Sequence, residues 1–105
     1  MPAHNNPVQF SGYTNFGGAY SPGGANFVLF SSMTDVNDGL HGLEIVVHEG
    51  MHQWDGQMSA ALTGPARAFN VAVPRDLTHA VMFFTTGEAV RRIDPAYVPV
   101  ADCPY

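Results

Sequence analysis

Residues 39–54 read GLHGLEIVVHEGMHQW, and this stretch decides both the predicted fold and the predicted chemistry. On a helix, His48 and His52 lie one turn apart on the same face, so one divalent ion can contact both side chains. Glu49 then lies beside that ion and can accept a proton from a bound water. Apart from Glu49, no charged residue falls in the motif 48–52 or in the three residues before it. The stretch therefore predicts a helix that carries a metal site.

The predicted helix runs from about residue 39 to residue 62, and Gly64-Pro65 is expected to end it. At about 100° per residue, its side chains separate into an apolar arc and a polar arc. The apolar arc, the expected core face, comprises Leu40, Leu43, Val47, Met51, Trp54 and Met58. The polar arc comprises His41, Glu44, His48, His52 and Asp55, with Glu49 just beyond it. This pattern is typical of a helix that forms the floor of a cleft. His41 is roughly 10 Å along the helix from His48, so we expect it to be a surface histidine.

The rest of the chain predicts a short sheet and a second helix. Residues 11–26 are rich in Gly, Tyr, Asn and Ser and predict a loop, which could fold over the cleft as a lid. Residues 27–32 (FVLFSS) predict a strand. Residues 66–73 suit either a short strand or a helix. After Asp76 as N-cap, residues 77–92 predict a helix that is apolar nearly all round and therefore largely buried.

Size and composition indicate one α+β domain of 105 residues, with 46% hydrophobic and 12% charged residues. The net charge is −5 and there is no lysine, so nucleic acid is not an expected partner. No apolar run is long enough for a transmembrane helix, so no membrane partner is expected. Residues 1–6 lack the pattern of a signal peptide, which leaves the cellular location open, and Cys103 has no second cysteine to pair with.

The motif and its flanks resemble the active-site helix of the zincin metallopeptidases. A catalytic zinc usually has three protein ligands and one water. The zincin subclass with a third histidine six residues after the second would need histidine at position 58, where this chain has Met58. The gluzincin subclass instead takes a glutamate from a downstream helix. Glu88 is the only glutamate after the motif, and 35 residues separate it from His52.

Two alternatives to Glu88 as a zinc ligand stay open. A carboxylate on an apolar helix needs a cation, and Arg92 at i+4 could supply that charge without a metal. His79 competes for the third position. It is half a revolution from Glu88, so one straight helix cannot direct both side chains at one ion. The default for His79 is a buried, hydrogen-bonded histidine.

Taken together, residues 27–32, 39–62 and 77–92 resemble a small gluzincin-type zinc metallopeptidase, and also bacterial proteins of unassigned function that carry this motif. The resemblance implies that His48, His52 and Glu88 bind Zn²⁺ and that Glu49 is the general base. It also implies a peptide or protein substrate whose backbone pairs with the strand 27–32 along the cleft.

The chain departs from the gluzincins at two points. Arg92 stands where those enzymes often place an acidic residue, four positions after the glutamate ligand. No motif identifies the residue that stabilises the oxyanion, for which His79 and Tyr97 are the candidates. The alternative function is a non-catalytic binding or structural domain in which zinc holds the two helices together.

Overall fold

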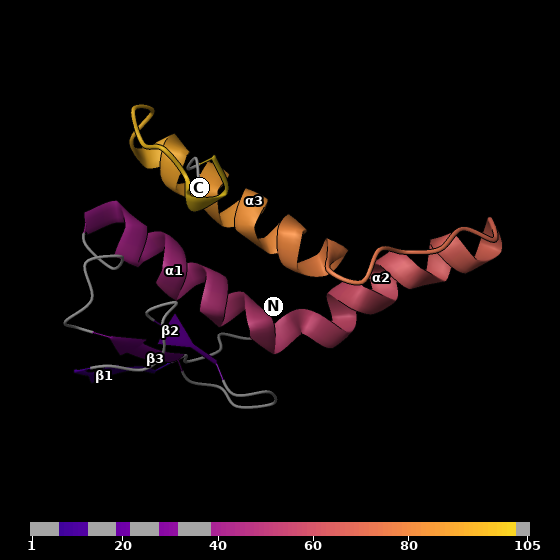
Figure 1. Ribbon diagram of the computed structural model, residues 1–105, viewed down its shortest axis with the longest axis horizontal. Coiled ribbons are helices and arrows are strands. Elements are labelled where there is room, and N and C mark those ends of the chain that lie inside the picture. Colours follow the sequence, from indigo (N-terminus) through magenta and orange to yellow (C-terminus); the bar gives the residue numbers. More distant parts are fainter. Residues whose placement is uncertain (1–6, 13–18, 22–27, 32–38, 103–105) are drawn as a thin grey trace.

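The computed structural model describes residues 7–12, 19–21, 28–31 and 39–102 of the chain. It is a small α+β structure with a three-stranded sheet at one end and three helices (Figure 1). The strands are β1 (Val8–Ser11), β2 (Ala19–Tyr20) and β3 (Val28–Ser31). The helices are α1 (Gly39–Met51), α2 (Asp55–Ala68) and α3 (Leu77–Ile93), with the short 3₁₀ turns η2 (His52–Trp54) and η3 (Val100–Asp102). No described helix has the length and apolar character that crossing a membrane requires.

The strand predicted at 27–32 is present as β3, and it is the central strand of the sheet. β1 pairs with it in parallel, Val8 opposite Val28, and β2 pairs antiparallel, Ala19 opposite Phe30. β3 therefore has neighbours on both edges and offers no free edge for a substrate backbone, which corrects the expectation from the sequence. β2 lies inside the segment 11–26, for which the sequence predicted a loop that could act as a lid; residues 13–18 and 22–26 of this segment lie outside the described residues.

Helix α1 lies between the sheet and α3 (Figure 1), and this position reverses the expected burial of its two arcs. The buried residues of α1 are Gly42, Glu44 and His48. Glu44 contacts the C-terminal segment, and His48 contacts α3. Leu43 and Val47, on the predicted core face, are 41% and 40% exposed. The three short strands cover only part of the apolar arc, whereas a whole helix covers the polar arc. The polar arc is therefore packed against a neighbour at Glu44 and His48, whereas His52 and Asp55 at its end are partly exposed.

The helix predicted at 39–62 is interrupted by η2 and continues as α2 to Ala68. Pro65 lies inside α2, so Gly64-Pro65 does not end the helix as predicted. The helix continues for one turn after it, and the amide of Phe69 donates to the carbonyl of Pro65. The chain turns at Asn70, whose φ of 53° is left-handed. The ambiguous segment 66–73 thus begins as helix and ends without regular structure.

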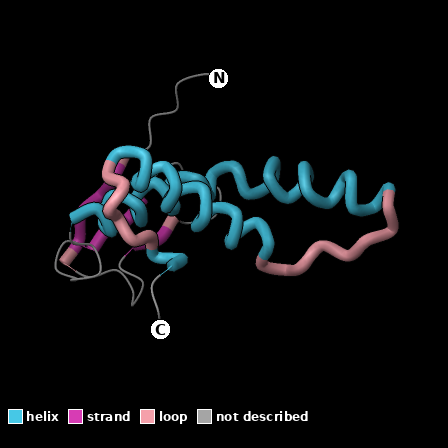
Figure 2. Tube along the Cα trace, turned by 90° about the horizontal axis from the view of Figure 1, so that it is seen from above, coloured by secondary structure: helices cyan, strands magenta, loops and turns pink. Residues whose placement is uncertain are grey.

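Figure 2 shows α2 and the loop after it as an arm that extends away from the sheet. None of the residues of α2 is buried. The chain returns to α3, which matches the prediction at 77–92 with one residue added. Only one face of α3 is buried, through Met82, Thr86, Gly87 and Val90, while Val81, Phe84 and Ile93 are exposed. The expectation of an all-round buried helix was wrong because α1 contacts a single face of α3.

The C-terminal segment folds back over α1 and α3. Tyr97 Oη donates a 2.5 Å hydrogen bond to Glu44 Oε2, which also accepts one of 3.1 Å from the amide of Val100. At Gly87 a Cβ atom would come within 2.6 Å of Pro99 Cβ, so glycine permits this close approach. These contacts hold the C-terminal segment against the helix pair.

Candidate metal centre

Three histidines from different elements come together between the helices. His48 is on α1, His52 is the first residue of η2, and His79 is in the first turn of α3. One ligand atom from each lies within 4.8 Å of the other two. In the part of the chain that the structure describes, this is the one group of three or more His, Cys, Asp or Glu side chains with such spacing. The two histidines of the motif are therefore brought together as predicted, and His79 joins them.

The distances between the imidazoles suit a tetrahedral ion. Zinc–nitrogen bonds of about 2.0–2.1 Å place two ligand nitrogens roughly 3.3–3.4 Å apart. His48 Nε2 and His79 Nε2 are 3.0 Å apart, slightly closer than that. The ring centroid of His52 lies 5.1 Å from that of His48 and 5.4 Å from that of His79. The three ligand atoms, which lie within 4.8 Å of one another, could therefore hold a metal ion.

Packing fixes the orientation of His48. Its ring stacks on Phe83 with centroids 3.9 Å apart and an interplanar angle of 28°. The side chain is only 1% exposed, and Nδ1 has no hydrogen-bond partner within the described part of the chain. Because Nε2 faces His79, it is the atom of His48 that is positioned to bind an ion.

Burial, together with the neighbouring His79 and His52, lowers the pKa of His48 to about 4, against an opposite effect of Asp55. The imidazole is therefore neutral at neutral pH, which is the form that binds metals. The 3.0 Å contact of the two Nε2 atoms also requires one nitrogen to donate and the other to accept. A metal ion would replace that shared proton.

The lowered pKa predicts how the stability of the metal-free protein depends on pH. Between the ordinary value of about 6.5 and about 4, the unfolded chain binds a proton at His48 that the folded chain does not. The free energy of unfolding should therefore fall as pH decreases through this window, by roughly 3 kcal/mol in total, and no further below it. Urea unfolding of the parent and of His48→Gln, measured in parallel from pH 4 to 7, isolates this contribution from that of the carboxylates. If His48→Gln does not fold, an NMR titration of the His48 ring replaces it, and a midpoint above 6 would contradict the prediction.

Asp55 orients the second histidine. Its Oδ2 accepts a 3.0 Å hydrogen bond from His52 Nδ1, which leaves Nε2 of that ring for the ion. A carboxylate behind a metal-binding histidine fixes the tautomer and makes the ligand more basic. Asp55 belongs to the polar arc predicted from the sequence, but its hydrogen bond to His52 was not predicted. Its position three residues after His52 was the available signal.

Glu49 lies next to this group, as its position in the motif predicts. Its side chain is 14% exposed, and Oε2 is 4.0 Å from His52 Nε2. Burial raises the pKa of Glu49, while the nearby His52 and a backbone hydrogen bond from Ser21 oppose that shift. A carboxylate with a raised pKa is a better proton acceptor than an exposed one.

Glu88, the glutamate predicted as third ligand, is not part of the group. Its Oε1 lies 2.9 Å from Arg91 Nη1, and both side chains are about one-third exposed. Because Glu88 and His79 are half a revolution apart on α3, the rotation that turns His79 toward His48 turns Glu88 away. The cation beside Glu88 is an arginine, as one alternative predicted, although it is Arg91 rather than Arg92.

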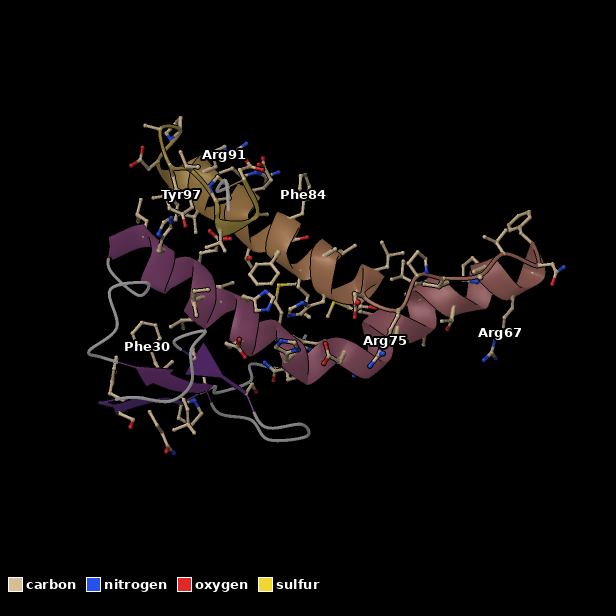
Figure 3. All side chains as sticks on the ribbon, in the orientation of Figure 1. Phe30, Arg67, Arg75, Phe84, Arg91 and Tyr97 are labelled. Atoms are coloured by element: carbon tan, nitrogen blue, oxygen red, sulfur yellow. The ribbon has the colours of Figure 1, made fainter. Side chains whose placement is uncertain are left out.

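Tyr97 and His79, the two candidates for stabilising an oxyanion, occupy different places. Tyr97 lies near the C-terminal end of α3 (Figure 3), where its hydroxyl is bonded to Glu44 and its ring meets His41 edge-on at 5.4 Å. His79 belongs to the histidine group itself. Its side chain is exposed and contacts Phe83 edge-on, so it is not the buried histidine that the sequence favoured.

The placement of Glu88 predicts that the variant Glu88→Gln keeps the zinc affinity of the parent within about twofold. The substitution removes only a surface ion pair, which contributes about 0.2–1 kcal/mol to stability. Competition with a chromophoric chelator measures the affinity, and thermal unfolding measures the stability. A tenfold loss of affinity would restore Glu88 as a ligand.

No family model, curated protein or solved structure matches this chain. The case for a metal site therefore depends on the geometry of the three histidines and on the carboxylates beside them.

Proposed function

We propose that this chain binds one zinc ion through His48, His52 and His79 and hydrolyses peptide bonds with Glu49 as general base. The observation that carries the proposal is the cluster of three ligand atoms within 4.8 Å of one another. Imidazole is a favoured ligand of zinc, and three protein ligands leave the fourth position open for water, as in catalytic sites. The resemblance to the zincins supports the roles of His48, Glu49 and His52. With His79 as third ligand, the site departs from the gluzincin arrangement.

The residues around the ion have separate tasks in this reaction. A bound zinc ion lowers the pKa of water and polarises a carbonyl group. Glu49 accepts a proton from the attacking water, whose oxygen forms a bond to the carbonyl carbon. The carbon–nitrogen bond then breaks, and Glu49 returns the proton to the departing amine. Asp55 holds His52 in the ligand orientation throughout. The products are a carboxylic acid and an amine.

A second function, a zinc ion that only holds the helices together, has an observation in its favour. The three ligands connect α1 and η2 to α3, and His48 is fully packed in the interface. An ion there would contribute folding free energy to a small domain. A purely structural zinc site leaves Glu49 without a role. The position of Glu49 beside His52 therefore favours the hydrolytic function.

Titration of the metal-free protein with zinc tests the proposal. Peptide cleavage, followed by mass spectrometry on a mixed peptide library, should rise to a plateau at about one equivalent of zinc and vanish with a chelator. Absence of zinc binding would overturn the metal site. Binding of one equivalent without cleavage of any peptide would overturn the hydrolytic function and leave the structural one.

A further inference from the structure

A pocket of about 180 Å³ adjoins the metal centre on the side of α2. His52 and His79, the two more exposed ligands, form part of its wall, so the pocket and the centre share two side chains. The remaining lining comes from α2, from the two residues before α3 and from the first turns of α3: Asp55, Ser59, Arg75, Asp76, Thr78 and Met82. A group bound in this pocket would therefore lie next to the ion.

Arg75 is the one cation in the pocket lining. Within the described ranges its guanidinium has no ion-pair partner, whereas Arg91 pairs with both Glu88 and Asp102. Figure 3 shows Arg75 beside the first part of α2. Of the two carboxylates in the lining, Asp55 accepts a hydrogen bond from His52, and Asp76 makes no side-chain capping hydrogen bond at the start of α3; neither forms an ion pair with Arg75 in the described part of the chain. Arg75 is therefore available to a carboxylate from outside.

The size of the pocket limits what can enter. Pockets for drug-sized ligands measure about 300–1,000 Å³, so a volume of 180 Å³ suits a single residue rather than a length of chain. A guanidinium binds a carboxylate through two parallel hydrogen bonds, which an amide cannot accept. Size and charge together favour the last residue of a peptide, whose α-carboxylate would reach Arg75 while its peptide bond lies at the ion.

We propose that this pocket binds the C-terminal residue of a peptide substrate and that Arg75 pairs with its carboxylate. The chain would then remove residues one at a time from free C-termini. The inference deepens the proposed function and depends on it for cleavage, whereas recognition of the carboxylate by Arg75 does not require turnover.

The test uses matched pairs of ligands that differ only in the terminal group. The probes are N-acetyl-leucine and its amide for binding, followed by NMR of the Met82 methyl group and by calorimetry, with and without zinc. The acid should bind about fivefold to tenfold more tightly than the amide, and Arg75→Gln should remove this difference. Arg67→Gln, an arginine at the far end of α2, is the control and should leave it unchanged. In cleavage assays, peptide acids should be shortened from the C-terminus and their amides should not.

The outcomes separate this inference from the proposed function. Acid preference without zinc, lost in Arg75→Gln, supports the pocket even if no ion binds. Zinc binding and cleavage with equal use of acids and amides would overturn the pocket and leave the hydrolytic function intact. An acid preference that survives Arg75→Gln would overturn the role of Arg75, and one that survives only with zinc present would assign the carboxylate to the ion. Cleavage of amidated peptides next to an internal Asp or Glu would show that the pocket recognises an acidic side chain, and would overturn recognition of the C-terminal carboxylate.

Discussion

Replacing His79 with alanine is expected to weaken zinc binding by at least about a hundredfold, because it removes one of three ligands. His79 is the best position for this test because its side chain is exposed, so the substitution leaves no cavity in the core. The metal-free variant should still fold, but it should unfold at a somewhat lower temperature than the metal-free parent, because the buried Nε2 of His48 loses its 3.0 Å contact with His79 Nε2. Calorimetric titration with zinc, or competition with a chromophoric chelator, gives the affinity.

His41→Ala is the matched control, since His41 is also a histidine on the polar arc of α1 but lies outside the group. Its Nε2 donates to the carbonyl of Val98 at 3.2 Å, so this substitution can loosen the C-terminal segment without touching the centre. We expect it to keep full zinc affinity. If His79→Ala also kept it while His52→Ala did not, the third ligand would have to come from elsewhere in the chain.

The contrast between His79 and Glu88 shows what the sequence could predict of the site. His48, Glu49 and His52 are positioned by the local geometry of one helix, and the four-residue spacing was enough to place them together. Which residue of α3 faces the two motif histidines depends on how α3 is rotated about its own axis against α1. That rotation is set by which face buries Met82, Thr86 and Val90, and both faces of α3 carry apolar residues. Periodicity therefore could not choose between His79 and Glu88.

The fold could be predicted from the sequence to a similar extent as the site. The strand at 28–31 and the limits of α3 followed from apolar runs and breakers, which act over a few residues. β2 has only two residues, too few to leave a pattern, and the central place of β3 depends on its pairing with distant segments. The burial of the polar arc of α1 was also not predictable. Tyr97 and the amide of Val100 donate to Glu44 Oε2 within the core, while Glu44 Oε1 is buried and has no hydrogen-bond partner in the described part of the chain.

Glu49→Gln is expected to lower the rate of peptide hydrolysis by about 10²–10⁴-fold, the usual contribution of a general base. Zinc affinity should change little, because Glu49 is not one of the three clustered ligands. Its Oε2 only lies close to one of them, 4.0 Å from His52 Nε2. Burial raises the pKa of Glu49, which means that its charged form is disfavoured in the fold at neutral pH. The neutral glutamine should therefore keep the melting temperature of the metal-free protein or raise it slightly.

This combination of results distinguishes a base from a ligand and from a structural residue. A lost ligand would lower zinc affinity together with turnover, and a lost structural contact would lower the melting temperature. Asp55→Asn provides the comparison, since it weakens the hydrogen bond to His52 and should reduce zinc affinity by about tenfold to a hundredfold while keeping the base. Equal turnover of Glu49→Gln and the parent, each with one zinc bound, would remove Glu49 from the mechanism. The raised pKa of its carboxyl group would then reflect only the packing of α1 against the sheet.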